Sequence, residues 1–128
     1  EDIARLAPRQ GWICPGGQCL EVLRSTSGLS IKVVPPRRQD RFVPSVDRLF
    51  ESAALAYGDR VIGVVLTGMG DDGARGALAI KNAGGIVLAE SEETAVIYSM
   101  PGAAVRAGAV ELSLPLRALA EHLAALVV

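Results

Sequence analysis

Apolar runs alternate with helical patterns from residue 45 onward. Residues 61–66 form a continuous apolar run rich in β-branched side chains. This run predicts a strand buried on both faces, because no polar side chain alternates with the apolar ones to face water. Residues 86–89 predict another buried strand, and residues 110–112 predict a last one. Strands that alternate with helices are typical of βαβ units, so we expect a parallel sheet.

The clearest helical pattern lies at residues 46–57, where apolar side chains recur at the spacing of one helical face. Ser45 precedes the pattern and is placed to cap the helix, and Asp47 adds an acidic group in the first turn. Gly58 follows the last apolar position and predicts the helix end.

Further helices follow along the chain. Residues 74–83 predict a helix that ends before a pair of glycines. Residues 92–98 predict a short helix capped by Ser91, and Pro101 suits the first turn of the next helix. Residues 116–127 carry an amphipathic pattern that a proline opens, and they predict a final helix.

The N-terminal third has a different pattern. Residues 1–10 carry no strong signal, and residues 11–17 predict a short strand that turn residues end. Imperfect alternation over residues 18–24 and a β-rich run over 31–34 predict a hairpin, with 25–30 as its loop. The sequence therefore predicts an α/β fold with a doubly wound, mostly parallel sheet and an appended antiparallel hairpin.

Composition restricts the class of protein. A chain of 128 residues has room for one core, so we treat residues 1–128 as a single domain. Hydrophobic residues make up 50% of the chain and aromatic ones 4%, so the core must be built mainly from aliphatic side chains. The 13 basic residues nearly balance the 14 acidic ones, and Arg37-Arg38 is the longest basic run. This pattern excludes a nucleic-acid-binding surface.

The sequence also bears on the location of the protein. No apolar run approaches the ~18 residues of a membrane span, and the acidic start is unlike a signal peptide. The two cysteines, Cys14 and Cys19, fit a reduced cytosolic protein at least as well as a secreted one. We therefore expect a cytoplasmic protein with no membrane partner. The chain begins at Glu1 rather than at a methionine, which indicates a fragment or a processed piece.

Residues 68–73, GMGDDG, match the pattern GxGxxG between a predicted strand and a predicted helix. This pattern can bind a dinucleotide pyrophosphate, and Glu90 ends the next strand roughly where a ribose-binding carboxylate belongs. However, Asp71 and Asp72 would repel the pyrophosphate. At about 6 Å and an effective dielectric constant of about 20, each unit-charge repulsion costs about 2–3 kcal/mol. Attraction to a helix N-terminus is worth only about 0.3–1 kcal/mol, so dinucleotide binding is disfavoured.

The aspartates of this loop allow two other interpretations. A carboxylate at the end of a strand can accept a hydrogen bond from a histidine ring and stabilise the imidazolium that forms during acyl transfer. Alternatively, Asp71 and Asp72 simply cap the helix that begins at Ala74. The loop by itself leaves both interpretations open.

Several segments carry a resemblance to a known family. They are RFVPSVDRLFESAA (41–54), VIGVVLTGMGDDGARGALAIKNAGG (61–85), AESEETAVIYSMPGAA (89–104) and GAVELSLPLRALAEHL (108–123). Residues 11–20, with their Pro-Gly-Gly turn, are similar to the strand and hairpin that precede these segments in the family. On these residues the chain resembles the catalytic domain of the chemotaxis protein-glutamate methylesterases, the CheB family.

The resemblance implies an activity and residue roles. Members of the family hydrolyse methyl esters of glutamate side chains on chemoreceptor helices and can deamidate glutamine there. The chemistry is serine acyl transfer without a metal or cofactor. The triad aspartate of the family falls on Asp72, whereas Asp71 matches a variable position and is expected to be solvated. Met69 matches a methionine near the nucleophile, and its alternative role is packing the loop against the sheet.

The nucleophilic serine and the histidine of the family precede the region present here, and this sequence holds no such serine segment. The one histidine, His122, is expected on the surface of the last helix, and nothing pairs with Cys14 or Cys19 to form a nucleophile or a zinc site. We therefore expect the C-terminal portion of a methylesterase domain. It would lack the N-terminal βα units and the receiver domain of the family, and it would be inactive alone.

Two departures from the family concern substrate contacts. Cys19 and Phe42 stand where the family commonly has histidines. The missing serine and histidine also leave a second class of function open, a non-catalytic module that binds a receptor or another partner. In either case, a fold without its N-terminal units would expose apolar surface and an unpaired strand edge, so we expect the isolated chain to self-associate.

Overall fold

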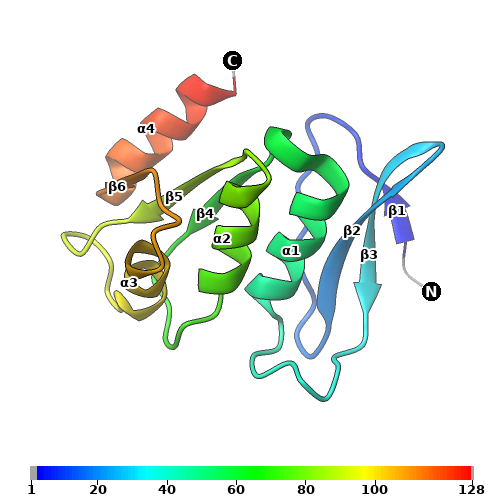
Figure 1. The fold of residues 1–128 in the computed structure, drawn as a ribbon, viewed down its shortest axis with the longest axis horizontal. Helices are drawn as coiled ribbons and strands as arrows, with labels where there is room; N and C mark the ends of the chain where they lie inside the picture. The colour runs from blue at the N-terminus through cyan, green and yellow to red at the C-terminus, as the bar shows by residue number, and fades with distance from the viewer. Residues whose placement is uncertain (1–2, 128) are drawn as a thin grey trace.

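A computed structural model describes residues 3–127, which form two three-stranded sheets with helices between and around them (Figure 1). The strands are β1 (Ile3–Arg5), β2 (Cys19–Ser25), β3 (Gly28–Val34), β4 (Ile62–Val65), β5 (Ile86–Glu90) and β6 (Leu112–Leu114). The helices are α1 (Val46–Tyr57), α2 (Ala74–Asn82), α3 (Ser99–Arg106) and α4 (Leu116–Leu126), with a 3₁₀ turn, η1 (Gly58–Arg60), after α1.

The parallel sheet has the order β4-β5-β6, and α2 and α3 are its crossover helices. Val65 and Val87 lie on the face of this sheet that packs with Ala77 and Ile80 of α2 and Ala104 of α3. α4 packs against β5 and β6. The alternation of strands and helices from residue 45 onward, and the α/β class that it predicted, are confirmed.

The antiparallel sheet has the order β1-β3-β2, and β2 and β3 form the predicted hairpin. Its turn is much tighter than the expected loop over 25–30, because Ser25 and Gly28 already pair across the strands. The predicted strand over 11–17 is wrong: this segment is irregular, and Gly17 has a φ of 79° that breaks an extended chain. β1 carries no sequence signal of its own and exists because it pairs with β3.

Two further predictions near the C-terminus are wrong. Residues 92–98 form a turn rather than a helix, because Glu90 and Thr67 bind polar groups of this segment from outside it. The Ser91 hydroxyl caps nothing and has no hydrogen-bond partner. The last strand is Leu112–Leu114 rather than 110–112, since pairing with β5 sets its register.

Helix α1 begins and ends as the sequence predicts. The Ser45 hydroxyl accepts a hydrogen bond of 3.1 Å from the backbone N–H of Arg48, and Gly58 ends the helix with a φ of 60°. α1 lies between the antiparallel sheet and α2 (Figure 1). On one side, the Ser52 hydroxyl accepts a hydrogen bond of 2.9 Å from the Val22 N–H of β2. On the other side, Gly76 of α2 comes so close that a Cβ atom there would lie 2.6 Å from Phe50 Cβ.

Arg48 links α1 to the hairpin and to the connector that precedes α1. Its Nε donates to Glu21 at 2.7 Å, and its Nη1 donates to the carbonyl of Pro35 at 3.0 Å and to Asp40 at 2.8 Å. Burial by itself raises the pKa of Asp40, but hydrogen bonds from Arg37 and the charges of Arg37 and Arg48 hold that pKa below its usual value. The guanidinium therefore neutralises the buried carboxylate of Asp40 and the part-buried carboxylate of Glu21, and it fixes the connector to α1.

Arg48→Met should lower the free energy of unfolding by about 3 kcal/mol, because removing one partner of a buried ion pair leaves the other charge uncompensated. Urea denaturation at neutral pH measures this change. Arg117→Met is the matched control, since Arg117 and Glu121 form an exposed pair at 4.0 Å and its loss should cost less than about 0.5 kcal/mol. Equal losses in the two variants would contradict a structural role for the Arg48 network.

Apolar side chains are exposed on the antiparallel sheet and on the irregular segment over residues 11–17. Ile13 is 95% exposed, and with Ile3 and Trp12 it borders an apolar pocket whose floor includes Leu20 and Ile31. Among the described strands, β4 pairs only with β5, so one of its edges has no partner there. None of the helices within residues 3–127 is long and apolar enough to cross a membrane.

We therefore predict that the 128-residue chain self-associates through this apolar surface. Light scattering over a concentration series should show a mass that rises with concentration. Ile13→Ser should weaken the association, whereas Arg106→Ser, at an exposed helix end, should leave it unchanged. A monomer at every concentration would contradict this prediction, because the exposed apolar surface would then be stable in water without a second chain.

Candidate functional site

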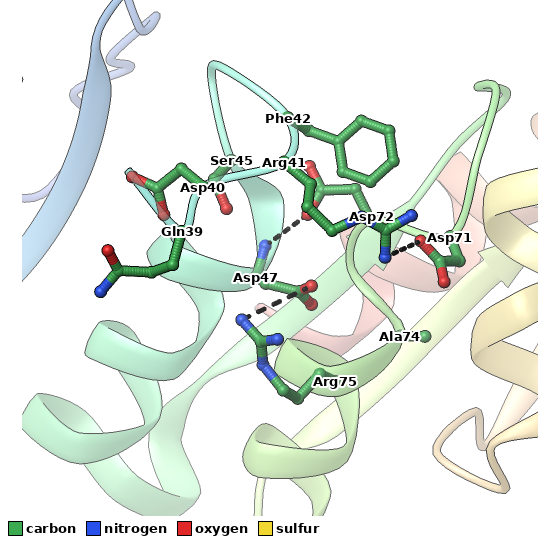
Figure 2. Close-up of a pocket in the computed structure, with 10 residues that line it drawn as sticks. All are labelled: Gln39, Asp40, Arg41, Phe42, Ser45, Asp47, Asp71, Asp72, Ala74 and Arg75. Atoms are coloured by element: carbon green, nitrogen blue, oxygen red, sulfur yellow. Dashed lines mark hydrogen bonds and ion pairs between the residues drawn. The ribbon is translucent and has the colours of Figure 1, made fainter. Parts of the chain in front are cut away.

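A pocket of about 170 Å³ lies where the loop after β4 meets the connector before α1 (Figure 2). β4 and β5 run parallel, so their carboxyl ends meet at one edge of the sheet, which is where ligands gather in open α/β folds. The pocket is lined by polar side chains for the most part. The residues are Gln39, Asp40, Arg41, Phe42, Ser45, Asp47, Asp71, Asp72, Ala74 and Arg75.

Asp72 is a buried member of this pocket, with 4% of its surface exposed. Its Oδ2 accepts a hydrogen bond of 2.7 Å from the N–H of Val46, and its Oδ1 accepts one of 2.9 Å from the N–H of Asp47. Burial raises the pKa of Asp72 above its usual value, although the amides of Val46 and Asp47 oppose that rise. The carboxylate thus binds the N-terminus of α1, whose unpaired amides carry partial positive charge.

Asp47 of α1 in turn binds the N-terminus of α2. Its Oδ1 accepts hydrogen bonds from the N–H of Gly73 at 3.0 Å and from the N–H of Gly76 at 2.7 Å. The interpretation in which Asp71 and Asp72 cap the helix at Ala74 is therefore wrong, because the carboxylate at the start of α2 comes from α1. Asp47 occupies the helix N-terminus at which a dinucleotide pyrophosphate would bind.

Asp72 keeps chemical capacity beyond this cap. A carboxylate has about four acceptor positions, and each of its oxygens can accept more than one hydrogen bond. Asp72 can therefore accept a ring N–H from an incoming histidine while it holds the amides of Val46 and Asp47. Its position is also fixed in advance by those amides, as the orienting member of a triad requires.

Asp71 and Arg41 lie at the exposed rim of the pocket (Figure 2). Arg41 Nη1 is 3.6 Å from Asp71 Oδ1, and the guanidinium lies 5.2 Å from the centroid of the Phe42 ring. Asp71 is solvated as expected, with 59% of its side chain exposed. Phe42 packs on Gly70, whose φ of 90° and close approach to the ring both require a glycine.

Met69 does not line this pocket. Its side chain is 72% exposed, so it does not pack the loop against the sheet. The structure therefore separates the two residues that the resemblance placed in the site: Asp72 is a buried residue of the pocket wall, and Met69 is exposed to solvent outside the pocket. Their catalytic roles stay predictions.

The other candidate groups lie elsewhere. His122 is on α4, which is well separated from the loop over 68–73 (Figure 1). Cys14 and Cys19 are free thiols near the hairpin; Cys19 is fully buried, and burial raises the pKa of Cys14. Within residues 3–127, no group of three or more histidine, cysteine, aspartate or glutamate side chains is placed to hold a metal ion.

Sequence reasoning missed the roles of two residues that shape the site. Asp47 was noted only as a first-turn acid, although it caps the neighbouring helix. Glu90 is 3% exposed and accepts hydrogen bonds from the N–H of Thr67 and the hydroxyl of Thr94, so it ties the loop after β4 to the turn after β5. An acidic residue at the end of an apolar strand was the only signal for Glu90, and it fitted a ribose ligand equally well.

Comparisons with known proteins identify the family of this chain. A family model described as CheB methylesterase matches residues 1–123. The protein-glutamate methylesterase/protein-glutamine glutaminase 1 of Myxococcus xanthus is 48% identical over 119 residues, which cover 93% of this chain and 34% of the relative. The protein-glutamate methylesterase/protein-glutamine glutaminase 6 of Anaeromyxobacter dehalogenans is 50% identical over 115 residues, which cover 87% and 33%.

A solved structure has the same fold. The crystal structure of the Thermotoga maritima CheB methylesterase catalytic domain matches with a TM-score of 0.82 and 33% identity, over 88% of this chain and 59% of that one. The chain spans about a third of the length of the two curated relatives. The family match over residues 1–123, the curated relatives and the shared fold place this chain in the CheB methylesterase family.

Proposed function

We propose that this chain is the C-terminal part of a catalytic domain that hydrolyses glutamate methyl esters on chemoreceptor helices and deamidates glutamine there. The reaction is serine acyl transfer. Asp72 orients and stabilises the catalytic histidine, and Met69 borders the nucleophile. The observation that carries this proposal is the buried carboxylate of Asp72 at the pocket wall, fixed by two amides and still able to accept a histidine N–H.

The serine and the histidine come from a segment outside these 128 residues. Support for this step comes from the chain itself, whose single histidine lies on α4, away from Asp72. Ser45, the serine that lines the pocket, already caps α1 through its hydroxyl. A receiver domain joined to the catalytic domain, as in the family, would regulate the complete enzyme.

A second function, a non-catalytic module that binds a chemoreceptor or another partner, also has a specific observation in its favour. Both carboxylate oxygens of Asp72 already bind the backbone of α1, so the residue has a structural role without any histidine. In this alternative the fold keeps its receptor-facing surface, and Asp72 serves only to hold α1 and the loop after β4 together.

The chain alone should show no hydrolysis of methylated receptor or of small esters, because it holds neither the nucleophile nor the base. A chimera tests the complete reaction: residues 1–123 replace the matching segment of the Myxococcus xanthus relative, whose own N-terminal part is kept. Release of methanol from methylated receptor membranes measures the activity. We expect methanol release from the chimera and none from the isolated chain. Turnover by the isolated chain would contradict the proposed division of the site, and a folded but inactive chimera would favour the binding module.

In that chimera, Asp72→Asn should lower kcat far more than Asp71→Asn. An amide cannot stabilise the imidazolium and can hold the wrong histidine tautomer, a change that costs about 10⁴-fold in a serine protease. Asp71 is the matched control because it is adjacent, acidic and solvated. Thermal unfolding of both variants separates a loss of catalysis from a loss of the α1 cap. Equal, small losses of kcat in the two variants would contradict the catalytic role of Asp72 and leave it only its role as a helix cap.

A further inference from the structure

The segment over residues 97–100 binds the backbone of the loop after β4. The Thr67 hydroxyl donates to the carbonyl of Ile97 at 3.1 Å and accepts from the N–H of Ile97 at 2.8 Å. The N–H of Gly68 donates to the carbonyl of Ile97 at 3.0 Å, and the carbonyl of Gly68 accepts from the N–H of Met100 at 3.1 Å. Residues 67 and 68 are therefore fixed by backbone groups and by the threonine hydroxyl.

The Ser99 hydroxyl binds the next part of the same loop, the backbone of Gly70. It accepts a hydrogen bond of 3.1 Å from the N–H of Gly70 and donates one of 2.9 Å to the carbonyl of the same residue. One side chain thus binds both backbone polar groups of a glycine that has a φ of 90°. Because glycine is the most flexible residue, such a double contact removes more freedom here than at any other residue type.

Ser99 is the first residue of α3 and follows the N-cap residue Tyr98, so its hydroxyl is not at the position from which a serine caps its own helix. Within residues 3–127, the N-cap residue Tyr98 makes no side-chain cap hydrogen bond to α3, and the Ser99 hydroxyl binds Gly70. A helix-forming role does not explain this orientation. The hydroxyl acts on the loop rather than on the helix that carries it.

Gly68 and Gly70, the two glycines held by these hydrogen bonds, flank Met69. Its side chain is 72% exposed, so side-chain packing contributes little to its position. Asp72 is held separately, by the amides of α1. The backbone at Met69 and Gly70 therefore depends on Ser99 more than any other part of the loop does.

We propose that Ser99 is a positioning residue, which fixes the Met69–Gly70 backbone in the geometry that the esterase reaction uses. This inference rests on the proposed function, in which Met69 borders the nucleophile. Ser99 does not touch the reacting atoms, and it acts through Gly70. Without its hydroxyl, the peptide groups on both sides of Gly70 can rotate, and Met69 loses its fixed place beside the substrate.

Hydrogen exchange tests the contact itself and does not depend on activity. In the 128-residue chain, mass spectrometry should show that one amide within the peptide covering residues 66–73, that of Gly70, exchanges about tenfold faster in Ser99→Ala, because it loses its hydrogen bond to the Ser99 hydroxyl. Ser99→Thr keeps a hydroxyl and should restore protection. Ser91→Ala is the matched control, because it removes a buried serine hydroxyl that has no partner. Unchanged exchange in Ser99→Ala would overturn the proposal.

Kinetics of the chimera test the positioning role. Ser99→Ala should lower kcat about tenfold with KM for methylated receptor within about twofold, since misplacement of a group beside the reacting atoms slows the chemical step. Ser99→Thr should recover most of kcat, and Ser91→Ala should match the unmodified chimera. All variants should unfold at the same temperature within about 3 °C. A variant that is slow because the whole domain is destabilised would instead unfold at a lower temperature.

The outcomes separate this inference from the proposed function. An unmodified chimera without esterase activity would contradict the proposed function and, with it, the positioning role, while the exchange experiment would still decide whether Ser99 holds the loop. An active chimera in which Ser99→Ala keeps full kcat, or in which Ser99→Thr is as slow as Ser99→Ala, would overturn the positioning role alone.

Discussion

The crossed caps between α1 and α2 are the contacts on which the rest of the structure depends. Asp72 binds the first amides of α1, and Asp47 of α1 binds the first amides of α2. Each helix N-terminus has unpaired N–H groups and a partial positive charge, so a buried carboxylate is its natural partner. Neither helix can slide along the other without breaking both caps. The exchange needs close helices, and Gly76 permits this because it brings no side chain between them.

The same constraint gives the candidate site its character. A carboxylate at a strand end would ordinarily be solvated and mobile, whereas Asp72 is buried and oriented before any partner group arrives. Preorganisation of this kind is what a triad aspartate needs, since it must hold a histidine ring in one orientation. The cap and the proposed catalytic role therefore depend on one geometry, and a stable helix junction provides it.

The walls of the pocket are fixed from different parts of the chain. Arg48 holds the connector through Asp40, which places Arg41 and Phe42 over the loop after β4. Ser99, at the start of α3, holds that loop through Gly70. Both attachments use a buried or part-buried polar group, and the one from Ser99 joins segments that are remote in sequence. Such bonds are strong in a site with little water, and they explain how a loop rich in glycine keeps one conformation.

The sequence alone determined the elements whose signals are local. The apolar run of β4, the amphipathic face of α1 with its Ser45 cap, and the alternation of strands and helices specified the α/β class. The motif around Asp72 and the Met-Pro segment sufficed for the family. Tertiary contacts decided the rest. β1 forms only because it pairs with β3, and residues 92–98 form a turn rather than a helix because they bind Glu90 and Thr67. Asp72 caps the distant helix α1 instead of the adjacent helix α2. These choices depend on which groups meet in space, and no pattern of neighbouring residues encodes that, because a buried polar group takes whichever partner the fold brings to it.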